Sequence, residues 1–291
     1  MTSNVAAPAA RQGDLRDRLA VSILLIPAAL VVIEVGGWPF AVAALALLAQ
    51  AAREYTRLFV HTRFRPAVAL VIGGVVLLVA AEQWPGLNPG GVLPTALILA
   101  AVLWHLLDYE RGAPASGSDF VITLGGIFYL GWLGRYFVAL RGLPDGLWWL
   151  VSTLTSMWLA DTGAYVFGRL LGRRLVRRPM APRLSPKKTW EGYLGSVLCG
   201  GLAGAGLGVF WSLGAGPGSS LTWQAAGVLG LLVGALGPVG DLGVSMLKRQ
   251  SGAKDTGRLI AGHGGALDRI DSWLVAVPLG YYFTIWMTTL R

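Results

Sequence analysis

Long uninterrupted blocks of apolar residues are the feature that most limits what this 291-residue chain can fold into. Nine such blocks occur, and several are long enough to cross the hydrocarbon core of a bilayer. Inside lipid, only helices and closed barrels satisfy their own backbone hydrogen bonds. The blocks are continuous rather than alternating, which excludes a barrel. Charged residues make up only 13% of the chain and hydrophobic residues 54%, which argues against an ordinary soluble enzyme. We therefore expect an all-α, polytopic transmembrane helical bundle.

The expected spans are joined mostly by short connections that carry glycine or proline. They run near 19–35, 39–52, 66–81, 92–107, 120–140, 147–170, 193–211, 223–239 and 272–290, and the second could extend through 53–59. This pattern divides the chain into a tail at 1–18, N-terminal transmembrane helices at 19–145 and a C-terminal catalytic transmembrane region at 146–291, with motif loops at 169–192 and 240–271. The tail lacks a cleavable signal pattern, and the single cysteine, Cys199, is expected to pack inside its span.

The 24 lysines and arginines are distributed very unevenly between alternate connections. With the N-terminus in the cytoplasm, 21 of them fall in cytoplasmic segments, Arg141 and Arg291 fall outside, and Arg135 lies within a span. The positive-inside rule therefore predicts this orientation. The same bias explains the net charge of +9 without a nucleic-acid partner, and it suits anionic lipid headgroups and substrates.

The first chemical signal is Asp161, which lies deep in the apolar segment 147–170. An ionised carboxylate is costly in a membrane and is by default a functional hypothesis. The residues that recur at helical spacing, and so are expected to share its face, are Trp158, Thr162, Tyr165 and Arg169. A structural pair between Asp161 and a neighbouring basic residue is the alternative.

The second signal is the sequence LSPKKTWEG at 184–192. Its hydroxyls, on Ser185 and Thr189, and its ammonium groups, on Lys187 and Lys188, precede the start of an expected helix. Such a combination at a helix N-terminus favours phosphate binding. Glu191 could complete that helix start together with an earlier Ser or Thr cap.

The third signal, at 240–272, is the richest in charged and small residues. Carboxylates with hydroxyls suit a hard cation such as Mg²⁺, which often binds through substrate phosphates. Lysines and arginines suit the rest of a polyphosphate, and a Gly-Gly pair lets the backbone approach a ligand closely. The candidates in this segment are Asp241, Ser245, Lys248, Arg249, Lys254, Asp255, His263, Gly264, Gly265, Asp268, Arg269 and Asp271.

Several other site types are excluded by missing patterns. No Cys/His spacing supports zinc, no GxxxxGK[ST] loop is present, and no G-x-S-x-G elbow occurs. The residues alone therefore indicate a membrane enzyme that handles phosphates at the cytoplasmic face with a divalent metal. They do not separate nucleotide transfer from lipid phosphate transfer or hydrolysis.

The third segment resembles the signature of the phosphatidate cytidylyltransferase, or CDP-diacylglycerol synthase, family. That signature is similar to S-x-x-K-R-x4-K-D followed by H-G-G-x-x-D-R-x-D, which here reads SMLKRQSGAKD at 245–255 and HGGALDRID at 263–271. Two upstream family motifs resemble DTGAYVFGRLLG at 161–172 and SPKKTWEG at 185–192. The match covers about 158–272 in the expected order, whereas the N-terminal spans are only generically hydrophobic.

The resemblance implies that CTP and phosphatidate are converted to CDP-diacylglycerol and pyrophosphate in phospholipid biosynthesis. It implies Mg²⁺, with a second cation such as K⁺ nearby, and metal ligation by Asp241 and Asp268, with Asp161 as a further metal candidate. Catalytic roles fall to these two aspartates and to Lys188, Lys248 and Arg249. The expected substrate-binding residues are Ser185, Lys187, Thr189, Ser245, Lys254, His263, Gly264, Gly265 and Arg269.

The family likeness also implies a setting. We expect an integral protein of a bacterial inner (cytoplasmic) membrane, with a polar cavity open to the cytoplasm and to the lipid. The partners are then CTP, phosphatidate and the bilayer, and a homodimer is an open possibility. Asp255 and Asp271 are expected to support the site or the structure rather than to react.

Three alternatives stay open at this point. A transporter of anionic solutes would use Asp161 and the basic loops as a gated path, although no inverted repeat is apparent. A related enzyme could activate a different lipid phosphate, such as an archaeal or polyprenyl one, with nearly the same motifs. A CDP-alcohol phosphotransferase is less favoured, because its D-G-x2-A-R motif is missing.

Overall fold

The computed structural model describes residues 27–60, 62–212, 219, 221–257 and 264–289. No β-strand runs through any of these ranges, and an isolated bridge joins Ala181 and Ser185 within a turn. The expected all-α class is therefore confirmed.

The helices follow the expected apolar segments closely. Residues 27–35 are helical, and the part of the first expected span before them lies outside the described residues. The later helices are α2 (Gly37–Arg57), α3 (Val68–Gln83), α4 (Val92–Glu110), α5 (Ser116–Gly126), the π-helical η3 (Ile127–Trp132), α6 (Tyr136–Gly142), α7 (Gly146–Leu170), α8 (Trp190–Ser212), α9 (Trp223–Leu236), α10 (Pro238–Gln250), α11 (Leu267–Ile270) and α12 (Trp273–Thr289).

The expected loop at 240–271 is the clearest structural difference. The eighth apolar segment ends near 239, but the chain stays helical through α10 to Gln250. Gly237 has helical dihedral angles, and Pro238 occupies the first turn of α10, where its missing N–H has no intrahelical partner to lose. The first half of this motif is therefore a helix, and Lys248 and Arg249 lie in its last turn, where cations favour the helix dipole.

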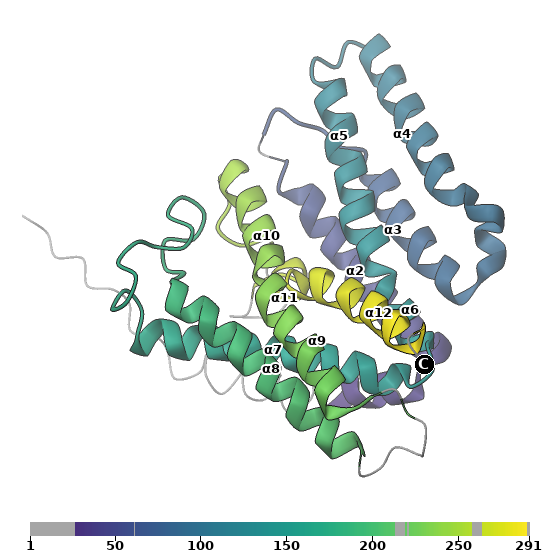
Figure 1. Cartoon of the computed structure of the whole chain (residues 1–291). Helices are drawn as coiled ribbons and strands as arrows, with labels where there is room; N and C mark the ends of the chain where they lie inside the picture. Colours follow the sequence, from purple (N-terminus) through teal and green to yellow (C-terminus); the bar gives the residue numbers. More distant parts are fainter. Residues whose placement is uncertain (1–26, 61, 213–218, 220, 258–263, 290–291) are drawn as a thin grey trace, which may run out of the picture.

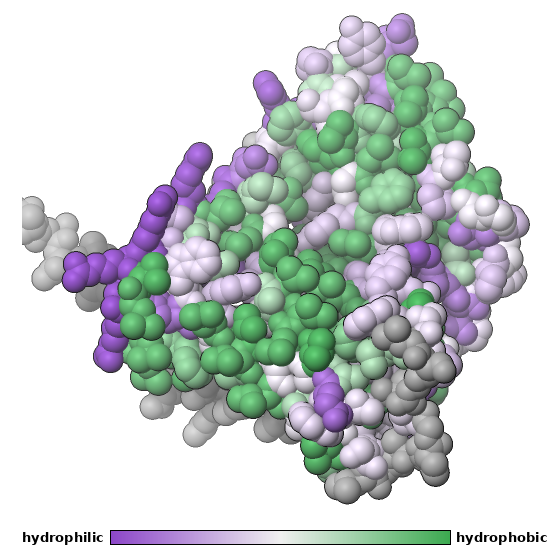
Figure 2. Space-filling model, in the orientation of Figure 1, coloured by the Kyte–Doolittle hydropathy of each residue, from purple (hydrophilic) through white to green (hydrophobic). Residues whose placement is uncertain are grey.

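Four helical stretches among the described residues are long and apolar enough to cross a membrane. They are Pro85–Glu110, Ser116–Gly142, Trp190–Ser212 and Trp223–Gln250. Large apolar side chains on the outer faces of α8 and α9 are exposed, including Leu198, Leu202 and Leu231. Figure 2 shows a wide apolar face, with hydrophilic side chains gathered at the left edge over the segment between α7 and α8. A surface of this kind fits lipid rather than water.

Helices α7, α8 and α9 pack against one another through small residues. A Cβ placed on Gly200 would lie only 2.5 Å from the carbonyl oxygen of Gly230, so the α8 and α9 backbones are in direct contact. Gly163 of α7 meets Cys199 in the same way, with an added Cβ 2.6 Å from its Sγ atom. Small residues permit this close approach in membrane helices. Cys199 is thus the packing residue that the sequence predicts.

The N-terminal helices and the C-terminal region share one hydrophobic core. Buried residues of α2, such as Leu48 and Tyr55, belong to the same cluster as Leu267, Leu274 and Val277 from the chain's end. In Figure 1, α7 and α8 run side by side at the lower left, α4 and α5 form a hairpin at the upper right, and α10 and α12 lie between them. This arrangement brings the C-terminal half of α7, the start of α8, α10 and α11 together.

Candidate active site

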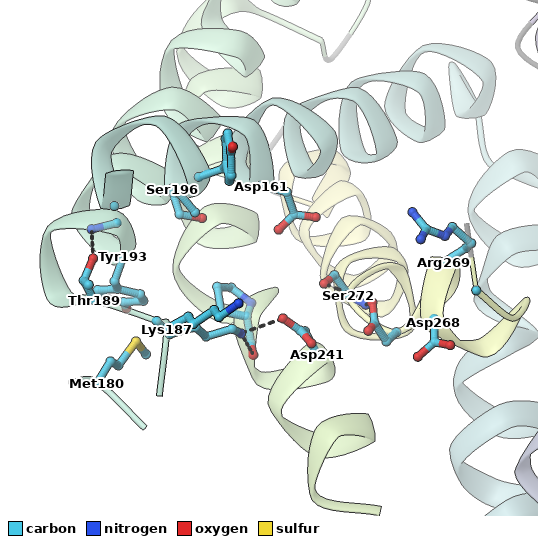
Figure 3. Close-up of a pocket in the computed structure, with 18 of the residues that line it drawn as sticks. Asp161, Met180, Lys187, Thr189, Tyr193, Ser196, Asp241, Asp268, Arg269 and Ser272 are labelled. Carbon is cyan, nitrogen blue, oxygen red and sulfur yellow. Dashed lines mark hydrogen bonds and ion pairs between the residues drawn. The ribbon is translucent and has the colours of Figure 1, made fainter. Parts of the chain in front are cut away.

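One cavity of about 960 Å³ lies where the three motif regions meet (Figure 3). Its wall comes from α7, the segment between α7 and α8, the start of α8, α10 and the residues around α11. The lining residues are Asp161, Ala164, Tyr165, Gly168, Arg169, Met180, Lys187, Lys188, Thr189, Gly192, Tyr193, Ser196, Pro238, Asp241, Lys248, Asp255, Gly257, Gly264, Asp268, Arg269, Asp271 and Ser272.

The cavity receives part of the face that the sequence predicts on α7. Asp161, Tyr165 and Arg169 all line the cavity, and Arg169 donates a hydrogen bond to the Tyr165 hydroxyl over 2.9 Å. Trp158 and Thr162 are the exceptions, since both are exposed and lie outside the lining. Figure 3 shows the Asp161 carboxylate directed into the cavity. Among the described residues no ion pair joins Asp161 to a lysine or arginine, although Lys188 is close enough for its charge to act on this carboxylate.

The segment that connects α7 to α8 is fixed by the residues that begin α8. The Thr189 hydroxyl accepts a hydrogen bond from the Gly192 N–H over 3.1 Å, which is an N-cap interaction. The sequence suggests that Glu191 completes a capping box at this helix start, but the structure shows a different role. Its carboxylate instead accepts N–H groups of Arg173, Leu175 and Val176 at 2.8–3.2 Å. Glu191 therefore ties the basic segment to α8 and leaves the lysines beside the cavity.

Lys188 connects this segment to α10. Its Nζ atom lies 2.7 Å from Oδ2 of Asp241, and the two side chains are 24% and 40% exposed. The other carboxylate oxygen of Asp241 accepts a longer hydrogen bond, 3.3 Å, from the Ser245 hydroxyl one turn further along α10. This ion pair therefore lies at the open side of the cavity, where solvent and a ligand can reach it.

Asp268 forms a second and more enclosed ion pair. Its Oδ1 lies 2.7 Å from Nζ of Lys248, and the two side chains are 11% and 14% exposed. Its Oδ2 accepts the Thr256 N–H, the Thr256 hydroxyl and the Gly265 N–H at 2.8–3.2 Å. Burial alone would raise the pKa of Asp268, but the hydrogen bonds from Lys248, Thr256 and Gly265 hold this pKa below its ordinary value.

The comparisons with known proteins agree with this site. The model of the cytidylyltransferase family matches residues 16–287, which is nearly the whole chain. The chain belongs to the cytidylyltransferase family. A phosphatidate cytidylyltransferase of Synechocystis sp. is 32% identical over 92% of this chain and 96% of its own length. One from Brucella suis is 34% identical over 93% of both chains, and one from Staphylococcus epidermidis is 36% identical over 73% of this chain and 75% of its own.

Asp241 also faces two further carboxyl groups, those of Asp161 and Asp271. Burial raises the pKa of Asp271 to about 7, and the negative charge of Asp241 and then of Asp161 adds to the increase, while the Ser272 N–H opposes it. Three acids thus face a common space in which their negative charges repel one another. A bound cation or a proton relieves that repulsion.

The donor set of this cavity matches a divalent cation in the type of its ligands but not in a finished arrangement. Among the described residues, no three Asp, Glu, His or Cys side chains lie close enough together to form a ready-made metal site. The chemistry of the donors nevertheless fits Mg²⁺, because carboxylates and hydroxyls are the hard oxygen ligands it prefers. Asp161 is exposed, and Asp241 is 40% exposed with one oxygen bonded to Lys188 and the other only to the Ser245 hydroxyl. Both oxygens of Asp268 are already bonded, so Asp268 can ligate a cation only if Lys248 shares or leaves it.

The cavity receives some of the predicted site residues and not others. Asp161, Lys187, Lys188, Thr189, Asp241, Lys248, Gly264, Asp268 and Arg269 line it, whereas Ser185, Ser245, Arg249, Lys254 and Gly265 do not. Arg249 and Lys254 are exposed, and Gly265 packs against a buried side chain of α2 instead of facing the cavity. His263 lies outside the described residues, so its role stays a prediction.

Several residues at the site carry no weight in the sequence interpretation. Tyr193, Ser196 and Ser272 line the cavity from positions that look like ordinary span residues. Thr256 holds Asp268 but lies between the two halves of the family signature. Glu54 of α2 contacts the same loop and is only 1% exposed. A signal for Glu54 exists, since it is an acid at the end of an apolar helix.

Proposed function

We propose that this protein transfers a cytidylyl group from CTP to phosphatidate, producing CDP-diacylglycerol and pyrophosphate for phospholipid biosynthesis. The observation that carries the proposal is the family match over 16–287. It is supported by one cavity that gathers carboxylates and lysines from three separate motifs. A volume of about 960 Å³ is in the range of pockets that enclose a nucleotide-sized ligand.

The reaction displaces pyrophosphate at the α-phosphorus of CTP. A phosphate oxygen of phosphatidate forms the new P–O bond, and the bond from the α-phosphorus to the β-phosphate oxygen breaks. The protein's task is to hold two anionic reactants in line and to offset their charge. Lys187 and Lys188, beside the open side of the cavity, are positioned to contact phosphates, with Arg269 on the opposite wall.

Lys188 has a specific part in this proposal. In the absence of substrate its ammonium neutralises Asp241 at 2.7 Å. A phosphate group competes for the same ammonium, because N–H bonds from lysine to phosphate are charge-assisted. When Lys188 turns to the phosphate, an oxygen of Asp241 is released for a cation. Lys248 and Asp268 form a second ion pair of the same kind, with both side chains more buried.

We assign Mg²⁺ to Asp241, with Asp161 and Asp268 as further ligands and a second cation such as K⁺ nearby. The metal supplies charge neutralisation for the phosphates of CTP when it is bound. Asp271 lies beside this cluster and adjusts its net charge. Ser185, Ser245, Thr189, Lys254, His263, Gly264 and Gly265 remain proposed substrate contacts, and Arg249 a proposed catalytic group.

The setting that we propose is a bundle of about nine spans in a bacterial inner membrane, with the cavity on the cytoplasmic side. The basic segment between α7 and α8 would lie against anionic headgroups. Phosphatidate then reaches the cavity sideways, since exposed Trp190 and Leu194 continue the wall at Tyr193 toward the apolar face. A homodimer stays a prediction of the sequence.

Product analysis tests the activity directly. Purified protein receives phosphatidate, CTP and Mg²⁺, and the lipids are examined by mass spectrometry. Parallel reactions contain polyprenyl phosphate or an archaeal-type ether phosphatidate in place of phosphatidate. We expect CDP-diacylglycerol, with one pyrophosphate released per lipid. Preference for another lipid phosphate would redirect the substrate assignment, and CTP-independent solute uptake into vesicles without any cytidylylated lipid would favour a transporter.

Site-directed labelling tests the orientation. On a Cys199→Ala background, single cysteines replace Arg183, Gly257 or Gly216. The positive-inside rule places the first two in the cytoplasm and the third outside. An impermeant thiol reagent added to intact cells should therefore label only position 216. Rapid labelling at position 257 would contradict the proposed orientation in the membrane.

A further inference from the structure

A buried carboxylate from the N-terminal half of the chain contacts the signature loop. Glu54 lies in the last turn of α2 and is 1% exposed. It is not ion-paired with any lysine or arginine among the described residues. A carboxylate that is removed from water without a charged partner is costly unless hydrogen bonds replace the lost solvation. The hydrogen-bond partners of Glu54 therefore indicate its structural role.

Those partners belong almost entirely to the loop around Asp268. One Glu54 oxygen, Oε2, accepts the Leu267 N–H over 3.0 Å and lies 3.1 Å from the Thr256 hydroxyl. The other, Oε1, accepts the side-chain amide of Gln50 over 3.1 Å. The Leu267 N–H opens α11, whose N-cap residue, Ala266, provides no side-chain acceptor. Glu54 thus supplies from another helix the acceptor that α11 lacks.

Thr256 links this carboxylate to Asp268. Its hydroxyl lies 2.8 Å from Oδ2 of Asp268 and 3.1 Å from Oε2 of Glu54, and its N–H donates to the same Asp268 oxygen. One hydroxyl proton serves only one of the two carboxylates at a time. The Thr256 side chain is therefore held between an acid on the cavity wall and an acid beneath it.

Two glycines allow the carboxylate to come this close. A Cβ on Gly257 would lie 2.7 Å from Oε1 of Glu54, and a Cβ on Gly265 would overlap Oε2. The second glycine of the Gly-Gly pair thus makes room for Glu54 on the side away from the cavity. Gly264 has a φ of +80°, a left-handed conformation that favours glycine, so the loop turns between the two contacts.

We propose that Glu54 is a positioning residue that, through Thr256 and the start of α11, orients Asp268 and its partner Lys248 toward the cavity. The expected effect of Glu54 on catalysis rests on the proposed function. Its expected effect on the order of the loop around Asp268 does not. The helix that contains Glu54 lies outside the segment that carries the family motifs. The site is thus completed by the N-terminal region, which the sequence marks only as hydrophobic.

The test separates hydrogen-bond geometry from charge and from general packing. Glu54→Leu keeps the side-chain volume but removes both acceptors. Glu54→Gln keeps an acceptor for Leu267 and Thr256, and Gln50 can rotate its amide to satisfy the new NH₂ group. Thr256→Val removes the linking hydroxyl, and Thr256→Ser restores it. The matched control is Glu82→Leu, which removes a carboxylate of α3 that pairs with Arg135 away from the cavity.

Hydrogen exchange is measured first, on full-length protein without substrate or metal. We expect Glu54→Leu to increase exchange at least tenfold in peptides covering 252–257 and 264–270, with Glu54→Gln close to wild type. Glu82→Leu should leave these peptides unchanged. Wild-type protection in a folded Glu54→Leu protein would overturn the proposal. If Glu54→Leu does not fold, Thr256→Val answers the same question, and unchanged exchange at 264–270 would again overturn it.

Kinetics then test the consequence for catalysis. Glu54→Leu and Thr256→Val should each lower kcat at least tenfold and raise the Mg²⁺ concentration for half-maximal rate, with KM for phosphatidate within about twofold. Their effects should not multiply in the double variant, because both act through one contact. Rescue by Glu54→Gln and Thr256→Ser is expected. The same kinetic pattern in Glu82→Leu would reduce Glu54 to a general packing residue. A wild-type protein that makes no CDP-diacylglycerol would refute the proposed function but leave the exchange result standing.

Discussion

The cavity has two lysine–aspartate pairs of equal length and unequal surroundings. Lys188 and Asp241 lie 2.7 Å apart at the open side, with side chains 24% and 40% exposed. Lys248 and Asp268 lie at the same separation, with side chains 14% and 11% exposed. Asp241 has only a long hydrogen bond from Ser245 besides its lysine, whereas Asp268 accepts three further donors.

The difference in burial predicts different roles for similar chemistry. An exposed ion pair stabilises a protein by about 0–1 kcal/mol, so Lys188 and Asp241 can separate at little cost and bind ligands instead. Removing one partner of a buried pair costs about 3–5 kcal/mol, since it leaves an uncompensated charge. The Asp268 pair is thus both part of the site and part of the structure that holds it.

The largest expected effect comes from neutralising the two aspartates. Asp241→Asn should fold and melt like wild type yet lose nearly all turnover, because an amide keeps the size but not the charge that a hard cation requires. Asp268→Asn should lose turnover and also lower the melting temperature, because it leaves Lys248 enclosed without its partner. Detergent-solubilised melting curves and CDP-diacylglycerol formation across a Mg²⁺ titration measure both. Substantial activity of either variant at an unchanged Mg²⁺ requirement would remove that residue from the metal site.

The lysines should show a smaller version of the same contrast. Lys188→Ala removes a charged hydrogen bond to phosphate, worth about 1.5–3 kcal/mol, so kcat/KM should fall roughly ten- to hundredfold without a change in stability. Lys248→Ala should lower both kcat/KM and the melting temperature, because it leaves the enclosed Asp268 without its lysine. Steady-state kinetics with each substrate varied in turn, together with melting curves, distinguish these results. Wild-type kinetics in Lys188→Ala would show that its charge serves only membrane orientation.

The pH dependence of stability gives a third contrast, centred on Asp271. A carboxyl whose pKa rises to about 7 in the folded protein binds more protons there than in the unfolded chain between pH 4 and pH 7. Stability in the presence of EDTA should therefore fall as the pH increases through this window. Asp271→Asn should make stability depend less on pH in this window. Adding Mg²⁺ should also reduce the loss of stability at higher pH, because the cation screens the carboxylates. Melting temperatures from pH 5 to pH 8 measure the effect; an unchanged slope in Asp271→Asn would assign it to other groups.

The smallest expected effect is that of Ser245→Ala. Its hydroxyl makes a 3.3 Å contact with Asp241, and the side chain is outside the cavity lining. A neutral donor of this kind contributes about 0.5–1.5 kcal/mol, so a roughly two- to tenfold loss of kcat/KM is expected. A loss as large as that of Asp241→Asn would instead place Ser245 in direct contact with substrate or metal.

The sequence predicts the helices well because lipid exposure leaves a simple trace in it. Continuous apolar runs delimit α3, α4, α7, α8 and α12 to within a few residues. The prediction fails after residue 239, where the expected span gives way to an expected loop at 240–271 although α10 continues to Gln250. The end of an apolar run marks where a chain can leave lipid, and it does not mark where the helix itself ends.

At the site, charged motifs predict which residues gather but not how they pair. Asp161, Asp241 and Asp268 do line one cavity with Lys188 and Lys248. The lysine partner of each aspartate depends on how the helices cross, which no local spacing encodes. The contact between Glu54 and Thr256 spans 202 positions along the chain and leaves no periodic pattern at all. Long-range polar contacts are therefore the part that required a structure.

The direct backbone contact between α8 and α9 has a consequence for how this protein can vary. Gly200 and Gly230 lie so close that the smallest added side chain would displace one helix from the other. Leu198 and Leu202, on the same helix but 55% and 74% exposed, have no such neighbour. A saturation library of α8 should therefore divide into two classes of position. The outward class accepts almost any apolar residue. The inward class accepts only small residues, such as Ser196 and Cys199, and glycine alone where backbones touch, as at Gly200. The membrane-facing surface can therefore vary in sequence, whereas the helix contacts behind the cavity cannot.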